Sequence, residues 1–253
     1  MLKTRIIPTL LLQNESLVKT IRFSKPSYIG DPINTVRIFN ELEVDELVFL
    51  DITASNEKRL PNMKILHEIA NECFMPLAYG GGISTLQQAQ DIFNIGFEKI
   101  VLNSASHTIP NLIVQITEIY GRQAVIVSVD VKKNFWGKYE VWSHSGTKNS
   151  KKNLVEWVQE LEIKGAGEIL LTSIDKEGTW SGFDVDLVRN VTDATTVPVI
   201  AHGGAGTINH IGEVVKQGNA SAVALGSMVV YQQKDMGVLV NFPEKAKIEN
   251  ILL

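Results

Sequence analysis

Two glycine-rich segments have the composition of phosphate-binding turns. Gly81 and Gly82 lie between an apolar run and a helical pattern, and Gly203 and Gly204 repeat this arrangement later in the chain. Glycine leaves backbone N–H groups unhindered, and the N-terminus of a helix favours an anion. Tight turns also need glycine, but the duplication favours a ligand with a phosphate at each end. Other small or polar residues that could complete the two anion sites are Asn103, Ser104, Gly178, Gly226 and Ser227.

Asp130 is the candidate catalytic residue. It ends an apolar run, and Ser128 stands two positions before it, so both side chains are expected on one face of a strand. A carboxylate in that position is a candidate general acid or base. Accepting hydrogen bonds from loop amides is the alternative role. Further polar side chains expected at the same end of the fold are Asp51, Asp175, Glu177 and His202.

Four charged residues stand at the opposite ends of predicted strands. Arg5 and Lys99 are basic, Glu46 and Glu168 are acidic, and each begins an apolar run, so the four could form a closed ring. Charges turned into a barrel must pair with one another to offset their desolvation. On this reasoning alone a salt-bridge plug is favoured over a gate to a central passage, although spacing does not separate the two.

These candidates lie at the ends of short apolar runs that alternate with amphipathic stretches, as in repeated βα units with a buried parallel sheet. The predicted strands are residues 5–12, 46–51, 76–79, 99–103, 123–130, 168–172, 198–201 and 221–225. The clearest helical patterns are residues 32–42, 63–72, 86–95, 154–163 and 208–216. The most loop-like segments are residues 13–31 and 142–152.

An internal repeat defines how these units are organised. Residues 76–85 (Pro-Leu-Ala-Tyr-Gly-Gly-Gly-Ile-Ser-Thr) align without a gap with residues 198–207 (Pro-Val-Ile-Ala-His-Gly-Gly-Ala-Gly-Thr). Residues 46–50 match residues 168–172 at the same separation. Eight units with this repeat predict one α/β domain over residues 1–253, a (β/α)8 TIM barrel built from two similar half-barrels. An open, doubly wound sheet is the alternative for βα repetition.

The composition excludes several classes of function. Among 253 residues, 24 are Lys or Arg and 28 are Asp or Glu, so the net charge of −4 favours neither nucleic acid nor an acidic membrane. No apolar run is long enough to cross a bilayer. The single cysteine, Cys73, can form no internal disulfide, and we expect a packed thiol in a reducing cytoplasm. No His, Cys or Asp spacing indicates a metal site, and we expect no cofactor.

Longer motifs resemble the cyclase subunit of imidazole glycerol phosphate synthase, a barrel of histidine biosynthesis. The resemblance runs almost end to end. It rests on residues 5–8 (Arg-Ile-Ile-Pro), 45–55 (Asp-Glu-Leu-Val-Phe-Leu-Asp-Ile-Thr-Ala-Ser), 80–83 (Gly-Gly-Gly-Ile), 165–175 (Gly-Ala-Gly-Glu-Ile-Leu-Leu-Thr-Ser-Ile-Asp) and 203–206 (Gly-Gly-Ala-Gly). Stretches of this length are far more specific than an isolated glycine motif.

The resemblance implies a route for ammonia. In that family a separate glutaminase subunit releases ammonia, which passes a charged ring and crosses the barrel to a ribulosyl substrate phosphorylated at both ends. The four charged residues at the strand starts match that ring, which reverses the preference for an inert plug. The resemblance also implies that Glu98 contacts the glutaminase and that Lys19 belongs to a mobile first loop.

One departure from the family bears on catalysis. The family uses two facing aspartates, of which Asp130 matches the first, but Leu11 stands where the second is expected. Loss of a positioned acid or base typically costs about a hundredfold to ten-thousandfold in rate. His202 also replaces a small residue, and residues 13–16 lack the family's basic, glycine-containing pattern. We therefore expect impaired cyclase activity.

Three functions are compatible with these residues. The first is a divergent subunit, like relatives in surface-polysaccharide pathways, that receives ammonia from a glutaminase and supplies it to a sugar amidotransferase for amidination of an acetamido sugar. The second is a working histidine-pathway cyclase that converts the bis-phosphorylated ribulosyl substrate and ammonia into imidazole glycerol phosphate and an aminoimidazole carboxamide ribotide. The third is a non-catalytic barrel that binds a phosphorylated metabolite and regulates a partner.

Overall fold

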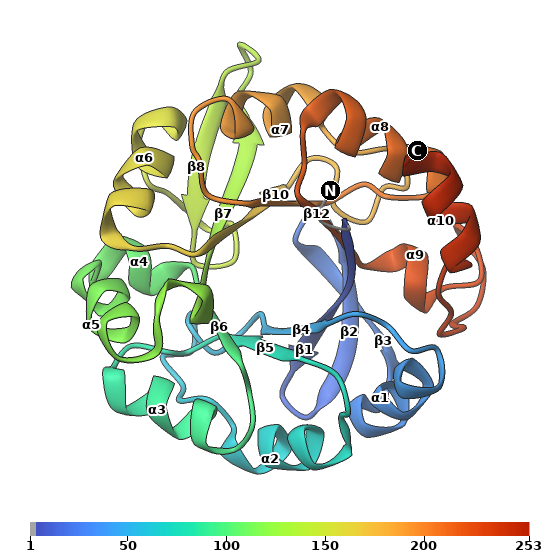
Figure 1. The fold of residues 1–253 in the computed structure, drawn as a ribbon, viewed down its shortest axis with the longest axis horizontal. Helices are drawn as coiled ribbons and strands as arrows, with labels where there is room; N and C mark the ends of the chain where they lie inside the picture. The colour runs from blue at the N-terminus through green and yellow to red at the C-terminus, as the bar shows by residue number, and fades with distance from the viewer. Residues whose placement is uncertain (1–3, 253) are drawn as a thin grey trace.

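Eight parallel strands close into a barrel in the computed structural model, which describes residues 4–252 (Figure 1). The barrel closes because the fifth strand around it, β7, pairs with β10 while β12 pairs with β1. This closure confirms the predicted TIM barrel and excludes the open sheet. The barrel strands, in order, are β1 (Arg5–Gln13), β4 (Leu47–Asp51), β5 (Leu77–Gly80), β6 (Lys99–Leu102), β7 (Val125–Lys133), β10 (Glu168–Ser173), β11 (Val199–His202) and β12 (Ala222–Leu225).

Helices surround the barrel on its outside (Figure 1). Each of the five helices predicted from the sequence is present, with boundaries within two residues of those expected. Side-chain caps define several starts; for example, the Asn153 carboxamide accepts from the backbone of Val155 and Glu156 at the start of α6. The helices are α1 (Pro32–Glu41), α2 (Met63–Glu72), α3 (Leu86–Asn94), α4 (Ser104–Thr108), α5 (Asn111–Tyr120), α6 (Leu154–Lys164), α7 (Val185–Thr192), α8 (Ile208–Gly218), α9 (Ser227–Val230) and α10 (Lys245–Leu252), with a 3-10 turn at Arg122–Ala124.

The internal repeat appears as repeated local geometry. Gly82 after β5 and Gly204 after β11 both have positive φ values, of 71° and 107°. The helices that follow begin at matching threonines, because Thr85 caps α3 and Thr207 caps α8 through hydrogen bonds to backbone N–H groups. The two half-barrels therefore share the turns that end their strands as well as their sequence pattern.

Both segments predicted as loops contain strands of hairpins that extend the barrel, although residues 142–152 are mainly loop, with strand only at 142–143 and 148–149. After β1, the chain forms β2 (Ser16–Ile21) and β3 (Ser24–Gly30), which pair antiparallel above the barrel. After β7, it forms β8 (Tyr139–Ser143) and the short β9 (Lys148–Asn149). The prediction missed these strands because they are polar and short. Their turns adopt left-handed backbone at Asn14 and at Arg22 and Phe23.

Alternation along the strands divides the interior into two cores. Outward side chains pack against the helices, and inward side chains form a separate aliphatic cluster on the barrel axis. Leu50 packs against this inner cluster at the carboxyl ends of the strands, the end that we call the mouth of the barrel. The inner cluster consists of Ile7, Val48, Ala78, Val101, Ile126, Leu170, Ile200, Ala222 and Ala224.

Candidate functional site

A cavity of about 290 Å³ opens at the carboxyl ends of the barrel strands. Its walls come from both half-barrels, since Gly81, Asn103 and Asp130 line it together with Thr172 and His202. The β2–β3 hairpin contributes Thr20 and Phe23 to the same cavity. The volume approaches the lower end of the range for small-molecule sites. The fold thus builds its cavity where this architecture places catalytic residues.

Asp130 lies inside this cavity and is almost fully buried. Ser128 donates a hydrogen bond to Oδ1 at 3.1 Å, and the Asn103 carboxamide donates to Oδ2 at 3.1 Å. Burial raises the pKa of Asp130 from 3.8 to about 7, although the hydroxyls of Ser128 and Thr172 partly oppose the shift. A carboxyl group with this pKa can both accept and donate a proton near neutral pH.

Leu11 also lines the cavity and is 6% exposed. It follows Ile7 and Thr9 on the inward side of β1, where Leu11 pairs with Leu50 of β4 and with Val18 of β2. The side chain at this position is therefore an aliphatic wall of the cavity. It offers no group that exchanges a proton with a ligand.

The first predicted phosphate site lies in the same cavity. Gly81, Gly82, Asn103 and Ser104 all line it. A Cβ at Gly82 would lie 2.5 Å from the backbone oxygen of Arg59, so close packing requires glycine there as well. Asn103 uses its amide nitrogen on Asp130, while its Oδ1 is buried and has no hydrogen-bond partner within residues 4–252.

The second predicted phosphate site is a smaller cavity beside the first. Its wall includes the buried ammonium-bearing side chain of Lys19, which comes from β2 and reaches under the turn after β12. A Cβ at Gly226 would lie 2.3 Å from Lys19 Nζ, so the ammonium fills the space that this glycine leaves. The remaining lining residues are Glu177, Gly178, His202, Gly203, Gly204, Ala205, Ala224 and Ser227.

The second cavity is lined by one basic side chain, Lys19, and one acidic side chain, Glu177. Lys19 Nζ has neither a hydrogen bond nor an ion pair among the described residues. Burial lowers the pKa of Lys19, and the negative charge of Glu177 partly offsets this by raising it. Burial, followed by the charge of Lys19, lowers the pKa of His202 to about 3, so the imidazole is neutral. Its Nδ1 lies 3.1 Å from Thr172 Oγ1. Lys19 is therefore the cation that the described residues present to this cavity, with the buried carboxylate of Glu177 in the same wall.

Glu177 holds the first hairpin over the mouth. Thr20 donates a hydrogen bond to Oε1 at 3.0 Å, and the backbone N–H of Phe23 donates to Oε2 at 3.1 Å. The backbone N–H of Arg22 donates to the Glu177 carbonyl at 3.0 Å. The carboxylate thus bridges β2 and its turn, and Lys19 is held in the second cavity as part of the same strand.

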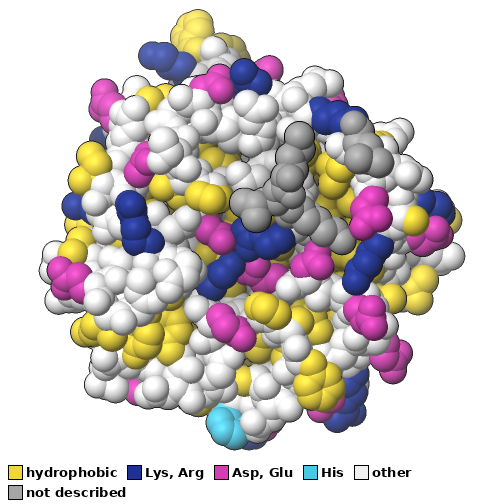
Figure 2. Space-filling model, in the orientation of Figure 1, with side chains coloured by type: hydrophobic (Ala, Val, Ile, Leu, Met, Phe, Trp, Pro, Cys, Tyr) yellow, Lys and Arg dark blue, Asp and Glu magenta, His cyan; other side chains and the backbone are white. Residues whose placement is uncertain are grey.

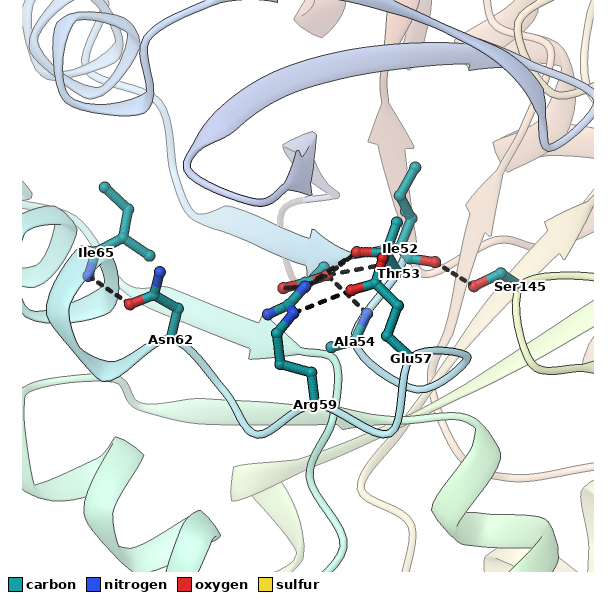
Figure 3. Close-up of polar contacts among 9 residues, drawn as sticks. Ile52, Thr53, Ala54, Glu57, Arg59, Asn62, Ile65 and Ser145 are labelled. Carbon is teal, nitrogen blue, oxygen red and sulfur yellow. Dashed lines mark hydrogen bonds and ion pairs between the residues drawn. The ribbon is translucent and has the colours of Figure 1, made fainter.

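Asp51 organises the loop between β4 and α2. Its carboxylate accepts hydrogen bonds from the backbone of Thr53 and Ala54 and forms an ion pair with Arg59 at 3.0 Å. Figure 3 shows Arg59 folded back over this loop toward Thr53, and the Ser145 hydroxyl approaching Ile52 from another loop. The sequence left Asp51 open between capping and ligand contact. These bonds show that Asp51 caps the loop, and because it also lines the cavity, ligand contact stays a prediction.

Asp175 is the one predicted mouth carboxylate that lines neither cavity. Its Oδ2 accepts a hydrogen bond from the backbone N–H of Lys133 at 2.7 Å, and its carbonyl accepts one from Arg22. It therefore joins the two hairpins. Asp175 thus lies at the predicted end of the barrel, but its side chain bonds to Lys133 while that of Glu177 lines both cavities, and a role of Asp175 at the ligand stays a prediction.

At the opposite end of the barrel, the four charged residues form a closed ring of ion pairs. Glu46 contacts Arg5 at 2.5 Å and Lys99 at 3.0 Å, and Glu168 contacts the same two cations at 3.0 and 3.1 Å. Basic and acidic side chains gather near the middle of the face drawn in Figure 2. The ring stands directly below the inner aliphatic cluster. Glu98, which precedes Lys99, is exposed beside it and accepts a hydrogen bond from Leu77 N.

Several site residues were not predicted. Thr20 and Phe23 reach the cavity only because the first hairpin folds over the mouth, and Thr172 does so because it faces inward from β10. The alternation of inward residues in β10 could have identified Thr172. Arg59 and Ser145 carry no pattern that links them to the mouth before the loops are placed.

Within residues 4–252, no cluster of His, Cys, Asp and Glu side chains could hold a metal ion. No helix in that range is long and apolar enough to cross a membrane. Cys73 ends α2 half-buried, and burial raises the pKa of its thiol to about 11. Its position gives it no part in the cavities.

Comparison with known proteins places the chain among its relatives. A family model described as "Histidine biosynthesis protein" matches residues 5–235. The "Putative imidazole glycerol phosphate synthase subunit hisF2" of Pseudomonas aeruginosa is 47% identical over 249 residues, which cover 98% of this chain and 99% of the relative. The chain belongs to this family. It is a HisF-like member of the histidine biosynthesis family.

Two other relatives of the family agree with this assignment. The "Putative imidazole glycerol phosphate synthase subunit HisF" of Leptospira borgpetersenii is 45% identical over 244 residues, 96% of each chain. The "Imidazole glycerol phosphate synthase subunit HisF" of Streptococcus sanguinis is 40% identical over 233 residues, 92% of each chain. The sequence similarity thus extends over the whole barrel, and the matched residues include both predicted phosphate sites and the charged ring.

Proposed function

We propose that this chain is a cytoplasmic, HisF-like subunit that receives ammonia from a glutaminase partner and conducts it through the barrel. In this proposal the mouth binds a small phosphorylated ligand, and the ammonia serves a separate sugar amidotransferase. The observation that carries the proposal is an intact ring of Arg5, Glu46, Lys99 and Glu168 below a mouth whose second acid/base position is Leu11.

The charged ring suits the entrance of such a route. Its two cations and two anions satisfy one another, so the ring is neutral and can exchange ion pairs while a small molecule passes. Beyond it, the aliphatic cluster admits neutral ammonia and opposes ammonium, because desolvating a charge there is costly. Midway, the hydroxyl of Thr9 is buried without a hydrogen-bond partner in the described chain and can bind a passing molecule.

The face around the ring suits a protein partner. Phe74 precedes β5 and is 86% exposed, and Ile163 ends α6 and is 85% exposed. Both lie at the end of the barrel where the strands begin, as does Glu98. Exposed hydrophobic side chains with a charged neighbour are typical of a protein interface. We assign this face to the glutaminase.

The mouth is suited to anion binding more than to two-carboxylate chemistry. Lys19 supplies a buried positive charge beside backbone turns at Gly203 and Gly226, and Asn103 supplies an amide at the other side. Asp130 is the lining carboxyl group whose pKa burial raises to about 7, and the opposite wall is Leu11. A ligand with two phosphates can bind in such a mouth, while cyclisation lacks its second acid/base group.

Copurification with the glutaminases of the same organism tests the proposal. The complex should hydrolyse glutamine faster than the glutaminase alone, and Phe74→Ser should weaken both binding and stimulation by at least about tenfold. Phe135→Ser is the matched control, since Phe135 is an aromatic of similar exposure, 93%, at the other end. If none of these glutaminases binds or responds to the chain, the proposal fails.

A working cyclase is the second candidate, and the pKa of about 7 at Asp130 favours it. The purified chain, supplied with ammonium salt and the bis-phosphorylated ribulosyl substrate, separates the two. Under the leading proposal Leu11→Asp should be faster than the natural chain by about a hundredfold or more. Rapid turnover by the natural chain that Leu11→Asp does not increase would establish the cyclase instead.

A further inference from the structure

Asp130, Thr172 and His202 form a row across the mouth of the barrel. They lie on the neighbouring strands β7, β10 and β11, where Thr172 pairs in register with Asp130 on one side and with His202 on the other. Side chains at one level of adjacent parallel strands point to the same face, and all three line the first cavity. All three residues are buried, so contacts between them are little exposed to competing water.

The Thr172 hydroxyl contacts both of its neighbours. It acts on Asp130 as a hydrogen-bond donor, and its Oγ1 lies 3.1 Å from Nδ1 of His202. A hydroxyl group carries a single hydrogen, whereas an ionised carboxylate can only accept. While Asp130 is ionised, Thr172 therefore donates to it, and the Thr172 oxygen accepts from the Nδ1–H of His202. The neutral imidazole then carries no hydrogen on Nε2.

The other ring nitrogen of His202 faces the second cavity. His202 lines this cavity as well as the first one. A Cβ at Gly226 would lie 3.9 Å from Nε2 and closer still to Lys19 Nζ, so both nitrogens border the space that this glycine leaves. Nε2 has no hydrogen-bond partner within residues 4–252. It is therefore the end of the row that can meet an anion in the second cavity.

A proton can cross this row with every atom accounted for. When Nε2 takes up a proton, the hydrogen on Nδ1 passes to Thr172 Oγ1, and the original hydroxyl hydrogen passes to the Asp130 carboxylate. In the end state the Asp130 carboxyl group donates to Thr172, Thr172 donates to Nδ1, and Nε2–H donates into the second cavity. Nε2 thus accepts hydrogen bonds while Asp130 is ionised and donates them once Asp130 is protonated.

We infer that Asp130, Thr172 and His202 form a proton relay that couples the ionisation of Asp130 to anion binding in the second cavity. A tetrahedral anion binds more tightly when Asp130 is protonated, because Nε2–H then donates to it beside Lys19. When Asp130 is ionised, the lone pair of Nε2 faces the anion and opposes its binding. The inference rests on the proposed function only for the anion site in the second cavity and is independent of the ammonia route.

Other charged groups near the row must be separated from the relay. Lys19 and Glu177 line the second cavity, and Asp51, which pairs with Arg59, lines the first. Burial raises the pKa of Asp130 to about 7 and lowers that of Lys19, so the charge of Lys19 is a second source of pH dependence. A variant that breaks the row but keeps Lys19 separates the two sources.

Nitrogen NMR of the imidazole rings tests the relay directly. Between pH 6 and pH 8, His202 of the natural chain should change from the Nε2–H to the Nδ1–H tautomer as Asp130 ionises. Thr172→Val keeps the shape of threonine without its hydroxyl and should abolish this change. His210 is the control, because its Nδ1 accepts from the Gly206 backbone N–H and its neutral ring stays Nε2–H. A His202 tautomer that ignores pH, or that follows it in Thr172→Val as well, would overturn the relay.

Calorimetric titration with sulfate measures the coupling to anion binding. Sulfate has the tetrahedral shape of phosphate and stays a dianion at these pH values, whereas a phosphate ester takes up a proton near about pH 6. The protonated fraction of Asp130 falls roughly tenfold between pH 6 and pH 8, so the natural chain should bind sulfate up to about tenfold more weakly at pH 8.

Two variants complete the titration. In Thr172→Val only the pH dependence that comes from Lys19 should remain. Asp130→Asn should bind sulfate at pH 8 as tightly as the natural chain does at pH 6, apart from that same contribution, because its amide nitrogen donates permanently to Thr172. Circular dichroism and thermal unfolding verify that both variants fold.

The outcomes separate this inference from the proposed function. If sulfate binds with the same pH dependence to the natural chain and to Thr172→Val, the relay is wrong while the anion site stands. Absence of sulfate binding at both pH values would overturn the coupling together with the proposed anion site. Stimulation of the glutaminase by the natural chain tests the ammonia route in a separate assay, so its failure leaves the relay to be decided by the NMR and sulfate results.

Discussion

Replacing Lys99 by methionine removes one of the two cations of the charged ring. Lys99 Nζ lies 3.0 Å from Glu46 and 3.1 Å from Glu168, and these carboxylates are only 4% and 12% exposed. After the change a single guanidinium, that of Arg5, faces both carboxylates, so the ring passes from neutral to a charge of −1. Removing one partner of a buried ion pair costs about 3–5 kcal/mol.

The partial exposure of the ring reduces that figure. The Lys99 side chain is 16% exposed and that of Arg5 30%, so water can solvate part of the unbalanced charge. We therefore expect Lys99→Met to lower the free energy of unfolding by about 2–4 kcal/mol. In a chain of this size that loss corresponds to a fall in Tm of roughly 5–15 °C. Urea unfolding and calorimetry at pH 7 measure both quantities.

A second substitution tests whether the charges act as a unit. Adding Glu168→Gln to Lys99→Met returns the ring to neutrality, so the double variant should be more stable than the sum of the single changes predicts. Arg189→Met is the control, since Arg189 pairs with Asp193 on the surface and should cost less than about 1 kcal/mol. If the stability losses caused by Lys99→Met and Glu168→Gln simply add in the double variant, the ring is not a coupled network. If Lys99→Met and Arg189→Met lower the free energy of unfolding equally, it is not a buried one.

Three further outcomes are expected. Asp130 keeps its proton to about pH 7 when folded but ionises near 3.8 when unfolded, so the natural chain should lose stability between pH 4 and 7. Asp130→Asn removes this loss, and urea unfolding at pH 8 should show a relative gain on the order of 2–4 kcal/mol that is absent at pH 4. Gly226→Ala displaces the ammonium of Lys19. Calorimetric titration with inorganic phosphate should then show at least about tenfold weaker binding, with a nearly unchanged Tm. Equal affinity of the variant and the natural chain for phosphate would contradict the anion site. Glu177→Ala removes the hydrogen bonds that hold the first hairpin. Amide hydrogen exchange in residues 16–30 should therefore accelerate, while the barrel strands stay protected. Unchanged exchange would show that Glu177 does not hold the hairpin.

The barrel was predictable because its signals are periodic. Aliphatic runs mark each strand, and the repeated turns at Gly82 and Gly204 mark the ends of equivalent strands in the two halves. The charged ring was predictable for a related reason. Three of its members begin a strand and Glu46 directly precedes one, and parallel strands in a closed barrel bring equivalent positions to one level.

The mouth was less predictable because it depends on how polar hairpins fold. Neither hairpin carries an aliphatic run long enough to indicate a strand, and Asn14 gave only a weak turn signal. The position of Lys19 follows from that hairpin, so its burial at the second cavity could not be derived from spacing. Asp175 and Glu177 are two residues apart, yet loop geometry sends one to the other hairpin and the other to the mouth.

Closure of the sheet between β1 and β12 has a consequence for biosynthesis. Arg5 pairs with Ala222, so the first strand to leave the ribosome waits for almost the last before its edge is covered. Until then the nascent chain holds an open sheet with two unpaired edges, a form prone to association with other chains. The symmetry of the halves adds to this risk, because a half from one polypeptide resembles the half that another lacks. Any process that shortens this wait or shields the open edge lowers the risk that halves are exchanged between chains.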